Sequence, residues 1–135
     1  MDRADLADKL HREGYNCCQA VACALADAVG ADPVMMYKVG EGFGAGMGTG
    51  RGVCGALSGA AMIAGLVHSD GNTEHAGQTK AKTTRAAGNI QRKFVEQAQG
   101  LICRDIKTGN NGGPFTSCSD CIRIATRLAE EELGL

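Results

Sequence analysis

Apolar residues recur along most of this chain at spacings of three and four, which predicts helices that bury one face. Segment 2–13 places Leu6 and Leu10 among charged residues and indicates a short amphipathic helix that Gly14 closes. Segment 73–99 carries one narrow apolar stripe on a polar, locally basic background, so we expect a long helix with a solvated outer face. Segment 53–67 has no charged residue and is short for a membrane span, which favours a buried central helix.

Helix-capping residues place three further elements. Asn16, with Gln19 three positions later, predicts a capping box, and we expect the helix that it begins to run to Gly30. An Asp–Pro pair at 32–33 is typical of a helix start and predicts a short helix to residue 39. Ser117 is expected to cap a final helix.

The remaining segments complete the expected architecture. Residues 101–106 indicate a short helical or turn segment, and the Gly- and Asn-rich stretch 109–114 predicts a loop. No segment alternates in the way that strands do. We therefore expect an all-α fold: one domain over residues 1–135, a bundle of about five helices with a glycine-rich loop before the central helix.

Glycine alternates with other residues through 40–52, directly before the central helix. Such a backbone can adopt positive φ and lets other atoms approach it closely. Within the central helix, Gly55 and Gly59 begin a ridge of small residues that would let a neighbouring helix pack closely. The letters of a dinucleotide-binding fingerprint occur at 50–55, but no strand precedes them, so nucleotide binding is not expected.

Composition and charge narrow the classes of function. The net charge is −1, which gives no support for nucleic-acid binding. Residues 1–10 lack the apolar stretch of a secretory signal, and no segment is suited to a membrane span, so we expect a cytoplasmic protein. Seven cysteines in a reducing compartment favour metal, cluster or redox chemistry over a disulfide framework, although one or two of them are expected simply to pack.

Three cysteines share one predicted setting. Cys17, Cys54 and Cys118 each lie at the start of a predicted helix, where unpaired N–H groups favour a thiolate. Cys103 lies beside a predicted turn. Cys118 and Cys121 also form a CxxC motif, which places both sulfurs on one helical face, as in a dithiol couple or half of a metal site.

The chain resembles the C_GCAxxG_C_C family of small proteins, which are named for their cysteine pattern and described as redox-active. The resemblance covers about residues 15–131, and its most specific part is the glycine loop leading into Cys54-Gly55-Ala56-Leu57-Ser58-Gly59. It implies that the family cysteines are Cys17, Cys54, Cys103 and Cys118. The resemblance also implies that Cys18, Cys23 and Cys121 are additions, although Cys18 or Cys121 could replace a family cysteine.

Two chemical interpretations and one structural interpretation follow. Four cysteines from separate segments match the ligands of an iron–sulfur cluster used for electron transfer, which we favour, or of zinc, with Cys17, Cys54, Cys103 and Cys118 as ligands. The alternative is a metal-free thiol–disulfide protein that uses Cys118 with Cys121 or Cys17 with Cys54. The third is a structural helical module whose cysteines only pack. Oxidoreductase activity, the redox partner and homo-oligomer formation stay open, but both chemical interpretations predict that the four family cysteines share one pocket.

Overall fold

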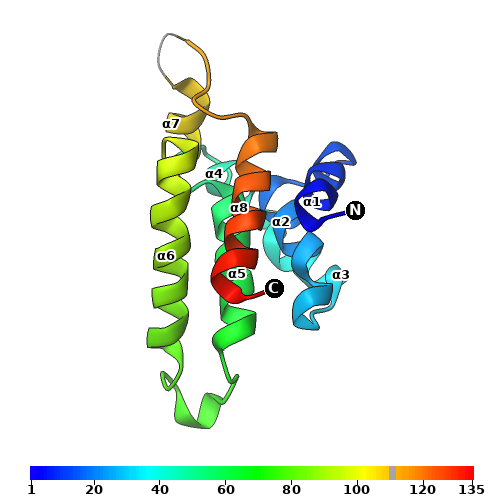
Figure 1. Cartoon of the computed structure of the whole chain (residues 1–135), viewed down its shortest axis with the longest axis vertical. Helices are drawn as coiled ribbons and strands as arrows, with labels where there is room; N and C mark the ends of the chain where they lie inside the picture. The colour runs from blue at the N-terminus through cyan, green and yellow to red at the C-terminus, as the bar shows by residue number, and fades with distance from the viewer. Residues whose placement is uncertain (110–111) are drawn as a thin grey trace.

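The computed structural model describes residues 1–109 and 112–135, and it is all-α, as expected (Figure 1). Its α-helices are α1 (Arg3–Arg12), α2 (Cys17–Leu25), α3 (Pro33–Gly40), α4 (Gly44–Met47), α5 (Gly55–His68), α6 (Lys80–Ala98), α7 (Cys103–Thr108) and α8 (Cys118–Leu133). The helices α1, α2, α5, α6 and α8 form the expected bundle, and the short helices α3, α4 and α7 raise the number above five. No β-strand occurs among the described residues, and the loop predicted at 109–114 includes residues 110–111, which lie outside them.

The long helices α5, α6 and α8 run beside one another along the longest axis, and α1, α2 and α3 pack to one side of them (Figure 1). Their shared core is aliphatic and contains one large aromatic residue. Ile90 and Phe94 of α6, Ile63 of α5, Ile122 of α8 and Leu25 of α2 are all fully buried. At one end of the bundle, α4 and α7 lie near the first turns of α5 and α8 (Figure 1).

Side-chain caps begin three helices where the sequence predicted them. The capping box of α2 is complete: the backbone N–H of Gln19 donates to Asn16 and that of Asn16 donates to Gln19, each at 2.9 Å. The side chain of Asp32 caps α3, and the side chain of Ser117 accepts from the N–H of Asp120 at the start of α8. Two of these capped helices, α2 and α8, begin with a cysteine, Cys17 and Cys118.

Glycines let α2 and α5 approach closely, which confirms the expected ridge of small residues. A Cβ added to Gly59 would lie 2.8 Å from the carbonyl oxygen of Cys18 in α2. One added to Gly55 would overlap the sulfur of Cys17 and lie 2.9 Å from the carbonyl oxygen of Phe43. The start of α5 is therefore fitted directly against the start of α2.

Three predicted helix boundaries were wrong. Helix α2 ends at Leu25, and a separate 3₁₀ turn leads to Gly30. Helix α6 begins at Lys80 because Gly77, at φ +87°, interrupts the segment that was expected to be helical from residue 73. Helix α5 begins at Gly55 because the backbone before it is extended, with the N–H of Cys54 donating to the carbonyl oxygen of Leu101 at 2.9 Å.

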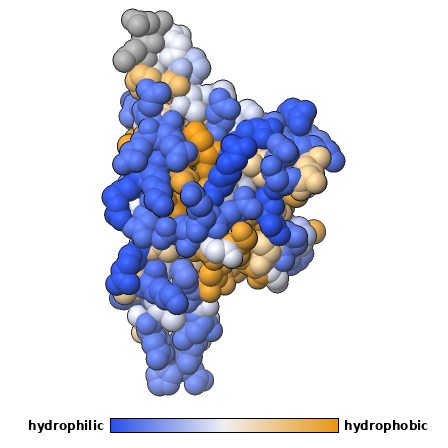
Figure 2. Space-filling model, in the orientation of Figure 1, coloured by the Kyte–Doolittle hydropathy of each residue, from blue (hydrophilic) through white to orange (hydrophobic). Residues whose placement is uncertain are grey.

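Hydrophilic residues cover most of the face in Figure 2, with apolar residues showing between them near its centre. The exposed large apolar side chains include Val34, Met35 and Val39 of α3. Among the described helices, none combines the length and the apolar character that a bilayer span requires.

Candidate functional site

The glycine-rich loop folds into a left-handed turn. Four consecutive residues, Ala45, Gly46, Met47 and Gly48, have φ values of 53°, 61°, 56° and 85°. Glycine adopts this conformation readily, whereas each residue with a Cβ pays about 1–2 kcal/mol. Strain of this size persists only where the surrounding structure fixes the backbone.

Neighbouring backbone fixes this turn against α7. The N–H of Gly52 donates to the carbonyl oxygen of Gly46 at 3.0 Å, and the N–H of Cys103 donates to the carbonyl oxygen of Gly52 at 2.9 Å. A Cβ on Gly46 would lie 2.6 Å from the Cβ of Cys103, so only glycine fits there. The left-handed turn therefore determines where Cys103 lies, and its Ala45 N–H donates to the sulfur of Cys17.

A single cavity of about 180 Å³ lies at this end of the bundle. Five cysteines line it: Cys17, Cys54, Cys103, Cys118 and Cys121. The structure thus brings the four family cysteines to one place, as the spatial hypothesis required, and adds Cys121 to them. Cys18 and Cys23 lie elsewhere.

Each of these five sulfurs comes from the start of a helix. Cys17, Cys103 and Cys118 are the first residues of α2, α7 and α8, Cys54 directly precedes α5, and Cys121 lies one turn into α8. Helices from four separate parts of the sequence therefore present their N-terminal ends to one cavity.

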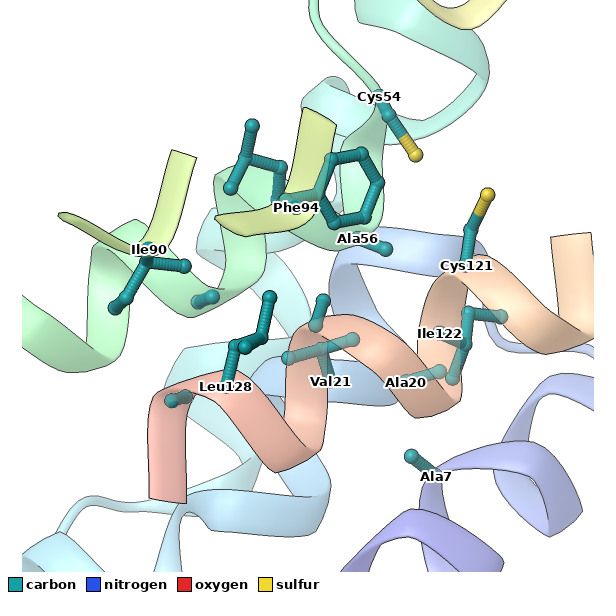
Figure 3. Packing of buried hydrophobic residues seen from close by; sticks show 14 of the residues in the cluster. Ala7, Ala20, Val21, Cys54, Ala56, Ile90, Phe94, Cys121, Ile122 and Leu128 are labelled. Carbon is teal, nitrogen blue, oxygen red and sulfur yellow. The ribbon is translucent and has the colours of Figure 1, made fainter. Parts of the chain in front are cut away.

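The sulfurs of Cys54 and Cys121 point toward one another in Figure 3. Both are buried, with exposed fractions of 7% and 3%. The thiol of Cys121 donates a hydrogen bond to Cys54, which is the main reason that the pKa of Cys54 falls to about 7 although burial opposes the change. The backbone N–H groups of Ala56 and Leu57 and the charge of Lys107 lower the pKa of Cys54 further.

The same contact acts in the opposite direction on Cys121. Its hydrogen bond to Cys54 and its burial raise the pKa of Cys121 well above the ordinary range. Since two thiolates in contact would repel each other, ionisation of one sulfur keeps the proton on the other. Cys54 is the thiolate of the pair, and Cys121 is the thiol.

A helix start did not lower the pKa of Cys17, contrary to the expectation from sequence. Burial raises the pKa of Cys17 more than the N–H donated by Ala45 lowers it. Burial likewise raises the pKa of Cys103, although the charge of Lys107 opposes it. Helix-start N–H groups favour a thiolate only where they are not outweighed by desolvation.

The two cysteines outside the cavity pack against other residues. Cys18 is fully buried, its sulfur lies 3.5 Å from the sulfur of Met62, and burial raises the pKa of its thiol to about 12. The sulfur of Cys23 lies 3.6 Å from the carbonyl oxygen of Pro33. These environments suit packing rather than reactivity.

The sequence analysis missed both the partner of Cys54 and the cation of the cavity. It paired Cys118 with Cys121 or Cys17 with Cys54, whereas the hydrogen bond joins Cys54 to Cys121, far away in sequence. Lys107 lines the cavity because it follows Cys103 by one helical turn, and that spacing was a usable signal. Within the described part of the chain, no carboxylate lines the cavity together with Lys107.

The donor set is chemically suited to an iron–sulfur cluster, because thiolates are the usual ligands of such clusters. A single metal ion fits the arrangement less well. In residues 1–109 and 112–135, no three His, Cys, Asp or Glu side chains lie close enough together to hold one ion. The roles expected for the four family cysteines as ligands stay predictions.

The fold and the site define a small helical protein with a cavity lined by cysteine thiols. Residues 15–132 match the family model described as "Putative redox-active protein (C_GCAxxG_C_C)", so the chain belongs to that family. No curated protein and no solved structure matches it.

Proposed function

We propose that this protein carries out thiol–disulfide redox chemistry with Cys54 and Cys121 as its reactive pair. The observation that carries the proposal is that the sulfurs of these two buried cysteines point toward one another (Figure 3) inside a cavity lined by cysteine. Membership of a family described as redox-active supports the same class of chemistry.

Each cysteine has a distinct part in the reaction. The thiolate of Cys54 attacks one sulfur of a substrate disulfide, the substrate S–S bond breaks, and the departing sulfur takes up a proton. Cys121 then attacks the sulfur of Cys54 in the mixed disulfide and gives its proton to the second departing sulfur. The products are a Cys54–Cys121 disulfide and two substrate thiols, so two electrons and two protons balance.

The electrostatics of the site support this order of events. With a pKa of about 7, Cys54 is about half ionised at neutral pH, and its nucleophilicity is not strongly reduced. The positive charge of Lys107 at the cavity favours the thiolate. When Cys54 attacks the substrate directly, Cys121 loses the main cause of its raised pKa once Cys54 has formed the mixed disulfide.

The pairing of sulfurs tests the proposal. Fully reduced protein is treated with 2-hydroxyethyl disulfide, quenched in acid and alkylated, and its disulfides are located by mass spectrometry of peptides. We expect a Cys54–Cys121 disulfide in the wild type and in Cys23→Ser, which alters a cysteine outside the cavity. Oxidation of other pairs while Cys54 and Cys121 remain reduced would contradict the proposal.

An iron–sulfur cluster is a second candidate, because the dithiol reaction leaves Cys17 and Cys103 unused. The cavity gathers these two with Cys54 and Cys118 from four separate segments, which is the number and type of ligands that such a cluster takes. The cluster would supply one-electron transfer, and the four cysteines would hold it.

One variant, Cys103→Ser, compared with the wild type, separates the candidates. Protein purified without oxygen is analysed for iron, acid-labile sulfide and visible absorption. The cluster candidate predicts all three in the wild type and their loss in Cys103→Ser. The dithiol proposal predicts that Cys103→Ser still forms the Cys54–Cys121 disulfide, and wild-type protein without iron or sulfide would remove the cluster candidate.

A further inference from the structure

Access differs sharply among the cavity cysteines. Cys54, Cys103 and Cys121 are buried, Cys17 is partly buried and Cys118 is exposed. Its neighbours Ser117 and Asp120 are exposed as well, so the first turn of α8 presents the Cys118 sulfur on an open surface. A cavity of about 180 Å³ has room for a small molecule, but not for the folded polypeptide around a protein disulfide.

Cys121 is the neighbour that Cys118 and Cys54 have in common. Cys118 and Cys121 are three residues apart in α8, which places them on one face of the helix. Both of them line the same cavity as Cys54, and the sulfurs of Cys54 and Cys121 point toward one another (Figure 3). The three sulfurs therefore form a connected series from the surface to the buried pair.

We propose that Cys118 is the sulfur that first reacts with a disulfide of another protein, and that Cys121 passes the oxidation inward to Cys54. The proposal rests on the function proposed above and names its partner class, a protein with an accessible disulfide. The exposed position of Cys118 and the size of the cavity carry it.

The relay consists of three exchanges. Cys118 attacks the partner's disulfide and forms a mixed disulfide, and its proton goes to the partner sulfur that leaves. Cys121 attacks the Cys118 sulfur and gives its proton to the second partner sulfur, which leaves a Cys118–Cys121 disulfide. The thiolate of Cys54 attacks Cys121, forms the Cys54–Cys121 disulfide and releases Cys118 as a thiolate. The partner gains two electrons and two protons, and the charge is unchanged.

The relay has a structural advantage over direct attack. Its final product is a disulfide between two sulfurs that are 7% and 3% exposed, which other thiols reach with difficulty. The exposed thiol is regenerated at the same time. Oxidation is thereby moved from an accessible site to a protected one.

The test compares the rates at which the full-length protein reacts with a protein disulfide and with a small disulfide. Reduced wild type, Cys118→Ser and the control Cys23→Ser react separately with insulin and with 2-hydroxyethyl disulfide, and the Cys54–Cys121 disulfide is followed by peptide mass spectrometry. The ratio of the insulin rate to the small-disulfide rate should fall at least about tenfold in Cys118→Ser, because attack depends on access to the sulfur. It should not change in Cys23→Ser.

Intermediates give an independent readout. Cys121→Ser should accumulate a mixed disulfide between Cys118 and insulin, and Cys54→Ser should stop at Cys118–Cys121. An unchanged rate ratio in Cys118→Ser, or a mixed disulfide on Cys54 instead, would overturn the relay alone. Wild type that forms no Cys54–Cys121 disulfide with the small reagent would overturn the proposed function, whatever the result at Cys118.

Discussion

The hydrogen bond between Cys121 and Cys54 can be removed without removing either the cavity or the reactive sulfur. In Cys121→Ala the donor is lost, so the pKa of Cys54 should rise from about 7 toward the ordinary thiol value of 9.0. Cys121→Ser keeps a hydroxyl donor at the same place and should leave the pKa of Cys54 close to 7. The two variants differ by one polar atom, so their difference isolates the hydrogen bond.

The expected change in reaction rate at pH 7 decides which assay is informative. At pH 7 a thiol of pKa about 7 is half ionised, whereas one of pKa 9.0 is only about one per cent ionised, a loss of about fiftyfold in thiolate. A thiolate of higher pKa is also the better nucleophile. With a Brønsted coefficient of about 0.4–0.5, a pKa rise of two units makes each thiolate up to about tenfold more reactive. A rate measured at pH 7 alone would therefore fall by only about fivefold.

The titration midpoint of Cys54 is the sharper measurement. Alkylation of the Cys54 peptide by iodoacetamide is followed by mass spectrometry across pH 5 to 11, an interval that extends about two units below the lower pKa and about two units above the higher one. We expect a higher midpoint in Cys121→Ala, by less than the full difference because the N–H groups of Ala56 and Leu57 remain. Equal midpoints in the wild type and both variants would refute the assignment of Cys54 as the thiolate.

Two further predictions concern stability, measured by urea unfolding. Gly55→Ala should destabilise the fold by about 1–3 kcal/mol because its Cβ would overlap the Cys17 sulfur, whereas Gly65→Ala, with no atom within 4 Å, should stabilise α5 by about 0.5–1 kcal/mol. The carboxylate of Asp8 accepts a hydrogen bond from the hydroxyl of Ser119 and forms a salt bridge with Arg123 at 2.9 Å. Both contacts lower the pKa of Asp8. This stabilises the folded state above about pH 3.9, the pKa of an aspartate in the unfolded chain. The stabilisation is lost as the pH falls through the lower pKa that Asp8 has in the folded protein, so Arg123→Met should weaken the dependence of stability on acid pH. Equal losses for both glycine variants, or an unchanged acid profile in Arg123→Met, would count against these readings.

Contacts between residues near in sequence could be predicted well. The capping box at Asn16 and the cap at Ser117 depend on side chains that reach backbone three residues away, so the residue types at those positions are sufficient to predict them. The small residues of α5 likewise predicted close packing, because small side chains let a neighbouring helix approach wherever they lie on a helix surface. Positive φ was expected for the glycines of the loop but not for Ala45 and Met47, which adopt it only through contacts outside the loop.

The sequence alone determined that this protein is helical, that Cys17, Cys54 and Cys118 lie at helix starts and that a glycine-rich backbone accompanies them. Only the tertiary structure decided which sulfurs face each other, because the packing of α5 against α8 joins Cys54 to Cys121. It also decided which thiol ionises. At Cys17, burial raises the pKa more than the backbone N–H groups lower it, whereas at Cys54 the thiol of Cys121 lowers the pKa together with the N–H groups. Proton affinity depends on what surrounds a sulfur in space, and neighbours along the chain supply only part of those surroundings.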